Sequence, residues 1–170
     1  KITHCLLVYE IRSPVIKSHE LQFGKLIAIG SFGEVYKGIC RGKDVAMKRL
    51  PAPEDDEDLE TILNEMEIVI HVRCVLVVFL MDRHPNVVLF MGVCIEESGD
   101  IVIVQELMNS DLFTYLRKNR TSLVEKLHIV LQIAEGMSWL HGGDPAIIHS
   151  DLKPDNVLMD ENGNAKVFIN

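Results

Sequence analysis

The stretch His149–Asn156, which reads His-Ser-Asp-Leu-Lys-Pro-Asp-Asn, constrains this chain more than any other part of its sequence. It places a carboxylate (Asp151), an ammonium (Lys153) and a carboxamide (Asn156) within six residues. A helical pattern precedes the stretch, and the apolar residues 157–159 follow it directly. We therefore predict a loop that holds these three polar groups at the mouth of a cleft.

The stretch resembles the catalytic loop of eukaryotic protein kinases, H-R-D-x-K-x-x-N. Ser150 departs from the pattern, because the family has arginine there, and this departure speaks against control by activation-loop phosphorylation. The resemblance implies that Asp151 accepts the proton of a substrate hydroxyl, Lys153 stabilises the transferring phosphoryl group and Asn156 holds one Mg²⁺. The position of Lys153, two residues after Asp151, is usual in Ser/Thr-directed kinases. The expected partners are therefore ATP and a protein substrate that presents a Ser or Thr hydroxyl.

Composition excludes several other classes of protein. The 170 residues suit one domain, and the net charge of -8 disfavours nucleic acid as a partner. The four cysteines lack C-x-x-C spacing, which predicts reduced thiols and a cytoplasmic location. The apolar stretch 69–81 is too short to span a bilayer, so no membrane span is predicted.

Two glycines near the start favour a phosphate-binding turn. Three strands are predicted, over residues 21–29, 34–38 and 45–50. Gly30-Ser31-Phe32-Gly33 joins the first two, and alone it would be read as a plain hairpin turn. Val35 and the later Lys48 make the region similar to the kinase Gly-rich loop and its phosphate-binding lysine. Ala28 replaces the first glycine of G-x-G-x-x-G, a mild change that should not abolish nucleotide binding.

A helix is predicted after the acidic run 54–58, with apolar residues at three- and four-residue spacing. Glu65 resembles the glutamate of helix C, whose ion pair holds Lys48 on the phosphates. Glu60 and Glu67 compete for this role, and a solvated charge is the plain alternative for each. The apolar insertion near residues 69–82 has no counterpart in the family. One hypothesis is a lengthened helix or an added strand, and the other is non-coding sequence translated into the chain. We favour the second hypothesis, because Asp82-Arg83-His84-Pro85-Asn86 resumes the kinase pattern.

The resemblance also assigns the hinge and the adenine pocket. Strands are predicted over 87–94 and 101–104, followed by the hinge at 106–108, whose backbone groups pair with adenine in the family. The residues implied to contact the nucleotide are Ile27, Gly30, Ser31, Phe32, Gly33, Val35, Ala46, Lys48, Glu106, Met108 and Leu158. Without the resemblance, the apolar members of this set would be read as core packing.

A short helix is predicted with Asp111 or Ser110 as its cap. A longer one is predicted from Ser122, with a Ser122-x-x-Glu125 capping box and a stop at Gly142-Gly143. Apolar residues at helical spacing, together with His141, mark one face of the longer helix: Leu127, Val130, Ala134, Met137 and His141. The predicted fold class is α+β, a protein-kinase-like two-lobe fold with a five-stranded antiparallel sheet plus helix C in the small lobe. Residues 1–20 form a leader of unknown role, 21–105 the small lobe, and 109–170 the first part of a large lobe. Three segments have sequences that look most like those of the tyrosine-kinase-like group, related to Raf and mixed-lineage kinases: Phe90–Cys94, Glu106–Met108 and Trp139–His141.

The aspartate of D-F-G, which binds a second Mg²⁺ in the family, should follow Val167, but the sequence there reads Phe168-Ile169-Asn170. We therefore expect phosphoryl transfer by this chain alone to be severely impaired. We also expect apolar faces of the Ser122–His141 helix to be exposed. The alternatives to an active kinase are a catalytically dead nucleotide-binding or scaffold module and a non-functional fragment.

Overall fold

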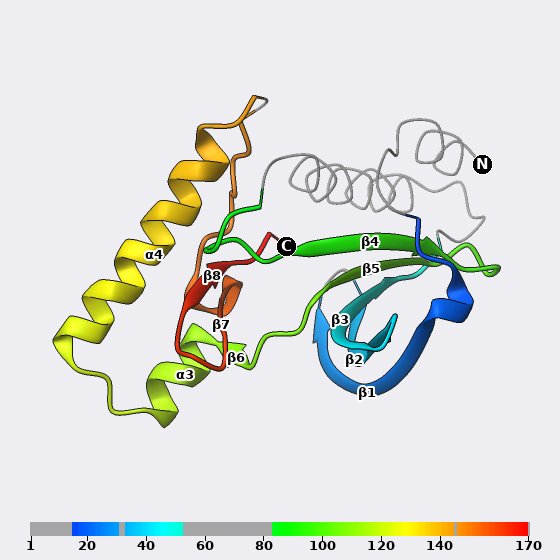
Figure 1. Cartoon of the computed structure of the whole chain (residues 1–170), viewed down its shortest axis with the longest axis horizontal. Helices are drawn as coiled ribbons and strands as arrows, with labels where there is room; N and C mark the ends of the chain where they lie inside the picture. Colours follow the sequence, from blue (N-terminus) through cyan, green and yellow to red (C-terminus); the bar gives the residue numbers. More distant parts are fainter. Residues whose placement is uncertain (1–14, 31–32, 53–82, 145, 170) are drawn as a thin grey trace, which may run out of the picture. The chain divides into compact units, whose positions relative to one another are not determined.

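The computed structural model describes residues 15–30, 33–52, 83–144 and 146–169. These residues form two compact units, one from residues 15–52 and Phe90–Leu107, the other from residues 83–89 and 108–169 (Figure 1). The predicted helix with Glu65, the apolar insertion near 69–82, and the loop residues Ser31 and Phe32 lie outside the described residues.

The first unit is built on one antiparallel sheet with the strand order β1-β2-β3-β5-β4 (Figure 1). The strands are β1 (Leu21–Gly30), β2 (Gly33–Cys40), β3 (Lys43–Leu50), β4 (Phe90–Ile95) and β5 (Ile101–Glu106), and a 3-10 turn, η1 (Ser18–Glu20), precedes them. This confirms the predicted five-stranded antiparallel sheet.

Local sequence explains the tight hairpin between β2 and β3. Arg41 (φ 50°) and Gly42 (φ 77°) both take left-handed backbone conformations, as a two-residue hairpin turn that follows the twist of the strands requires. One face of the sheet carries a buried apolar cluster: Ile16, Leu21, Cys40, Val45, Met47, Cys94, Val102 and Val104. Ala46 and Lys48 alternate with Val45 and Met47 along β3, so they belong to the opposite face.

The second unit combines a small sheet, in the order β6-β7-β8, with two helices (Figure 1). Its elements are β6 (Ser110–Asp111), α3 (Leu112–Lys118), α4 (Leu123–His141), the 3-10 turn η2 (Pro154–Asn156), β7 (Val157–Met159) and β8 (Ala165–Val167). The small sheet packs on the helices through Leu112, Ile129, Val157, Met159 and Ala165.

Both helix starts agree with the sequence. The Asp111 side chain accepts a hydrogen bond from the Thr114 amide (2.6 Å) and caps α3. Ser122 and Glu125 form the predicted capping box at the start of α4, and Gly142 is its C-cap. The helix boundaries predicted from caps and glycines are therefore confirmed.

Two predictions about packing need correction. The strand predicted over 87–94 is β4, Phe90–Ile95, because Val87 instead forms a parallel bridge with Val167 of β8 in the second unit. The buried face of α4 also differs from the stripe that marks the helix in the sequence. Its buried residues are Ile129, Gln132, Gly136 and Leu140, whereas the predicted stripe residues Leu127 and Val130 are each 60% exposed.

The exposed apolar side chains of α4 are Leu123, Val124, Leu127, Val130 and Leu131, in agreement with the expectation of an uncovered face. In the described part of the chain, no helix has the length and hydrophobicity needed to cross a membrane.

Candidate active site

The loop before η2 brings three predicted catalytic residues together. An oxygen of Asp151, Oδ2, lies 2.7 Å from Lys153 Nζ and accepts a hydrogen bond from Asn156 Nδ2 at 2.9 Å. Asn156 Nδ2 also donates to the backbone carbonyl of Asp151 at 2.8 Å. Asp151 Oδ2 is thus held by the lysine and the amide, and Oδ1 of the same carboxylate is left to face an incoming group.

The electrostatics of this cluster keep the carboxylate ionised. The hydrogen bond from Lys153 is the main cause that holds the pKa of Asp151 below its usual value, and it raises the pKa of Lys153 in turn. Both side chains are about half exposed, so the pair is a solvent-screened one. At neutral pH the loop therefore presents a carboxylate beside an ammonium.

His149 and Asn156 tie the loop to Phe168, the residue that follows β8. His149, which is 8% exposed, lies with Nε2 2.8 Å from the carbonyl oxygen of Phe168, so Nε2 carries the proton. Its Nδ1 is then an acceptor, 3.4 Å from the Asp151 amide. The amide of Phe168 donates to the carbonyl of Asn156 at 2.9 Å. His149 and Asn156 thus both hold the backbone of Phe168 in place.

Ser150, between His149 and Asp151, has a φ of 61°, which is uncommon for a residue other than glycine. This conformation turns the chain so that His149 is buried while Asp151 is exposed. The strained position therefore separates the residue that anchors the loop from the residue that faces solvent.

Asn156 has the chemistry of a metal ligand. It is 5% exposed, and its Nδ2 is committed to Asp151, so Oδ1 is the atom available to a cation. Mg²⁺ prefers oxygen ligands, and Asn156 fits as one of them. In the described residues no group of three or more acidic, histidine or cysteine side chains could hold a metal by itself.

Lys48 lies in the first unit, in the middle of β3. It is 3% exposed, and burial lowers its pKa from 10.5 to about 8. Val35 of β2 and Ile103 of β5 flank it directly across the sheet. Ala46, two residues away, shares its face. The structure thus brings three predicted nucleotide residues, Val35, Ala46 and Lys48, together on one face.

The glycines and Ile27 lie at the hairpin of β1 and β2. Gly30 pairs with Gly33, which has a φ of 136° and whose missing side chain would collide with the carbonyl of Arg49. Only glycine suits that position. Ile27 lies at a bulge between the pairs that Leu26 and Ala28 form with β2, and it is 49% exposed.

The remaining predicted contacts are divided between the units. Glu106 ends β5 opposite Val45, whereas Met108 and Leu158 belong to the second unit, where Leu158 pairs with Asp111. All three are partly buried. Lys48 and Asp151 likewise belong to different units.

Comparison with known proteins identifies the family. A family described as "Protein tyrosine and serine/threonine kinase" matches residues 21–168. The chain belongs to the protein kinase family. Among relatives of this kinase chain are the dual specificity protein kinase shkA (35% identical) and the probable serine/threonine-protein kinase drkB (39% identical), both of Dictyostelium discoideum. The serine/threonine-protein kinase TNNI3K of Mus musculus is 36% identical. These relatives confirm the predicted tyrosine-kinase-like group.

The kinase chain spans less than a third of these relatives. The matches cover 91%, 89% and 87% of this chain but 28%, 21% and 17% of shkA, drkB and TNNI3K, respectively.

Sequence reasoning missed the anchoring contacts around this loop. His149 belongs to the catalytic-loop motif, but the motif predicts no contact for its side chain. Phe168 attracts attention in the sequence only because the family has D-F-G in this region. The sequence carries no signal for the burial of His149, because the apolar Ile148 beside it is the exposed residue.

Proposed function

We propose that the protein is an ATP-dependent protein kinase that transfers the γ-phosphate to a Ser or Thr hydroxyl of a protein. The observation that carries this proposal is the cluster of Asp151, Lys153 and Asn156. It offers an ionised acceptor for a hydroxyl proton, a cation beside it and a buried carboxamide oxygen within one short loop. Phosphoryl transfer needs positioning and charge neutralisation more than covalent chemistry, and these groups provide both.

In this mechanism Asp151 is the catalytic base. Its free oxygen accepts the proton of the substrate hydroxyl and orients that oxygen toward the γ-phosphorus. Lys153 keeps Asp151 ionised and stabilises the charge on the transferring phosphoryl group. Asn156 fixes the Asp151 carboxylate through Nδ2 and would hold one Mg²⁺ through Oδ1; when bound, that ion neutralises phosphate charge.

ATP is proposed to bind through the first unit and the hinge. Lys48 binds the α- and β-phosphates, and Glu65 supports it. Burial lowers the pKa of Lys48 to about 8, and negative phosphate groups beside its ammonium would stabilise the charged form. The turn that includes Gly30, Ser31, Phe32 and Gly33 is proposed to cover the phosphates.

The adenine ring is proposed to lie between apolar side chains and the hinge. The residues assigned to it are Ile27, Val35, Ala46, Glu106, Met108 and Leu158. We propose the following division of the chain. Residues 1–20 are a leader, and residues 21–105 form the small lobe, with its insertion near 69–82. Residues 106–108 form the hinge, and residues 109–170 form the first part of the large lobe. We place the protein in the cytoplasm, which the free cysteines Cys40 and Cys94 support.

A second candidate function is nucleotide binding without transfer. The observation in its favour is the sequence Phe168-Ile169-Asn170, which offers no carboxylate where the family supplies a magnesium ligand. Both functions share the ATP site, and only transfer separates them.

The test measures transfer of labelled γ-phosphate from ATP to a generic Ser/Thr protein substrate, with the wild-type chain and Asp151→Asn. Asp155→Asn is the matched control, because it removes a neighbouring exposed carboxylate of the same loop. Transfer that Asp151→Asn abolishes and Asp155→Asn retains supports the kinase. Transfer that survives Asp151→Asn refutes the assigned base, and the absence of transfer despite ATP binding favours the second function.

A further inference from the structure

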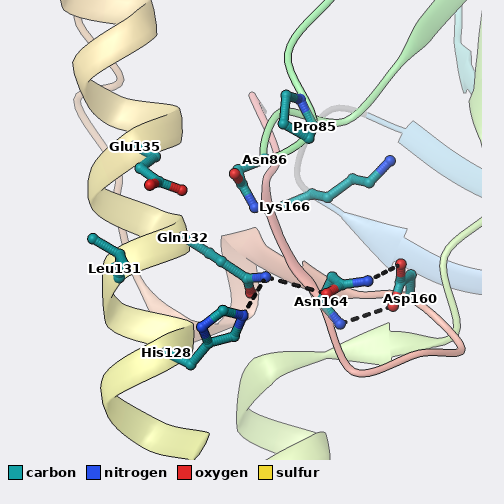
Figure 2. A pocket seen from close by; sticks show the side chains of 9 residues that line it. All are labelled: Pro85, Asn86, His128, Leu131, Gln132, Glu135, Asp160, Asn164 and Lys166. Carbon is teal, nitrogen blue, oxygen red and sulfur yellow. Dashed lines mark hydrogen bonds between the residues drawn. The ribbon is translucent and has the colours of Figure 1, made fainter.

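A hollow with a volume of ≈ 420 Å³ lies in the second unit, between α4, residues 85–86 and the turn that joins β7 to β8 (Figure 2). No residue of the loop 149–156 lines it. The hollow is therefore separate from the candidate catalytic cluster, and its lining groups need an explanation of their own.

Asn86 turns its carboxamide oxygen toward this hollow. The side chain is 5% exposed, and its amide lies 2.9 Å from the carbonyl oxygen of Ala165. A carbonyl can only accept, so the atom that faces it is Nδ2, and Oδ1 must be the atom turned the other way. Figure 2 shows that oxygen pointing toward α4. No described residue donates a hydrogen bond to it.

The other polar groups of the lining are already engaged. Gln132 Oε1 accepts from the Ala165 amide (2.8 Å), so its Nε2 faces Asn164 Oδ1 and His128 Nε2, both at 3.2 Å. His128 Nε2 is then an acceptor, and both donors of the Gln132 amide are used. Asp160 accepts three hydrogen bonds within its own turn, two of them from Asn164. These groups form the polar wall of the hollow, and His128, with Nε2 as the acceptor, carries its proton on Nδ1.

Glu135 supplies the second available acceptor. Its exposed carboxylate projects from α4 into the hollow and forms no ion pair or hydrogen bond with another described residue (Figure 2). Lys166 also lines the hollow, but its ammonium is directed away from α4 (Figure 2). Pro85 and Leu131 add apolar surface. The hollow thus offers a carboxylate, a carboxamide oxygen and two apolar contacts.

We propose that this hollow binds an arginine side chain of a partner protein. A guanidinium group brings several donors in a plane and no acceptor, which suits the two oxygens that the hollow offers, Asn86 Oδ1 and the Glu135 carboxylate. Its methylene stem can lie on Pro85 and Leu131. The excess of 25 acidic over 17 basic residues in the chain favours a cationic ligand as well.

The occupant is a protein segment, because the hollow continues into a second one. That second hollow has a volume of ≈ 350 Å³ and shares His128 and Asn164 with the first. Tyr115, Val124 and Ile129 give it apolar surface. A chain that carries the arginine can therefore follow α4, which a free amino acid would not need.

The test titrates the blocked tripeptide acetyl-Ala-Arg-Ala-amide into the full chain and follows the NMR signals of the Asn86 side-chain amide and the Glu135 backbone amide. Peptides with lysine or citrulline in place of arginine, and free arginine, are the comparison ligands. Glu135→Gln keeps the shape of the side chain and removes its charge. Glu161→Gln is the matched control, since it removes one exposed charge of the same unit outside the hollow.

We expect saturable shifts with the arginine peptide, roughly tenfold weaker binding for Glu135→Gln, and less than about a twofold change for Glu161→Gln. Citrulline should not bind, because it lacks the charge. The proposal is overturned by absent or non-saturating shifts, by equal binding of citrulline or lysine, or by equal affinity of Glu135→Gln. Tighter binding of free arginine than of the peptide would overturn the assignment to a protein segment.

Discussion

Gly136 is a point of close approach between α4 and residues 86 and 167, and Gly136→Ala tests how the helix positions β8. A Cβ atom at this position would lie 2.5 Å from the backbone oxygen of Asn86 and 3.1 Å from Val167 Cγ2. The same Asn86 oxygen accepts the hydrogen bond of the Val167 amide at 2.8 Å. The added methyl group must therefore displace backbone that is already hydrogen-bonded.

Two opposing effects set the magnitude. In an exposed helix interior, alanine in place of glycine stabilises by about 1 kcal/mol. Here, overpacking against backbone costs about 1–3 kcal/mol, and weakening of the Val167 hydrogen bond costs about 1 kcal/mol more. We expect a net loss of roughly 1–3 kcal/mol, which lowers Tm by about 2–10 °C for a chain of this size.

The assay is thermal and urea unfolding of the wild type, Gly136→Ala and Ser138→Ala. Ser138 is exposed on the same helix, so its change to alanine should be neutral or slightly stabilising. Faster hydrogen exchange of the Val167 amide in Gly136→Ala would locate the damage at β8. If Gly136→Ala raises the stability as an exposed helical glycine would, the proposed close approach is wrong.

Three further predictions concern other contacts. In an NMR titration, the Asp151 carboxyl should titrate below its usual pKa, and its midpoint should move upward in Lys153→Met. The reason is that the ion pair is present above the lowered pKa and lost as the pH falls through it; an unchanged midpoint would exclude Lys153 as the main cause. Gln132→Leu should lower the free energy of unfolding by about 1–3 kcal/mol, since it leaves the Ala165 amide without its acceptor; a neutral result in urea unfolding would contradict this. Ser122→Ala should cost about 1 kcal/mol by the same measurement through the lost N-cap, and an unchanged midpoint would argue against the capping box.

The sequence predicted the elements whose signals are local. The capping box at Ser122 depends on neighbouring residues only, and its prediction agrees with the structure. The sheet was predictable because its strands are rich in β-formers and are bounded by turn residues. The catalytic loop was predictable because its three polar groups lie within one short stretch.

The packing of α4 was not predictable in the same way. The helix carries two stripes at helical spacing, and the more apolar one, with Leu127 and Val130, is exposed. The buried stripe contains Gln132 and Gly136, because β8 and residue 86 come so close that a small residue and an amide fit better than a large apolar side chain. Such approaches between distant segments leave no periodic signal in the sequence.

The contacts of residues 86–88 with β8 were hidden for a related reason. The amide of Val167 donates to Asn86, and the amide of Val88 donates to the carbonyl of Val167 at 2.9 Å, so this short segment covers one edge of β8. In the sequence the same residues read as the beginning of the next strand, because Val87 and Val88 are good β-formers. Periodicity indicates that a segment is extended, but not which sheet it joins.

The most direct test of the proposed ATP site, on which both candidate functions depend, is ATP-dependent thermal stabilisation, with Mg²⁺, of the wild type, Lys48→Met and Lys43→Met. Lys48 is buried in β3, and Lys43 is exposed at the start of the same strand. We predict a saturable rise in Tm for the wild type and Lys43→Met that is lost in Lys48→Met. No stabilisation of the wild type, or equal stabilisation of all three proteins, would contradict an ATP site built on Lys48.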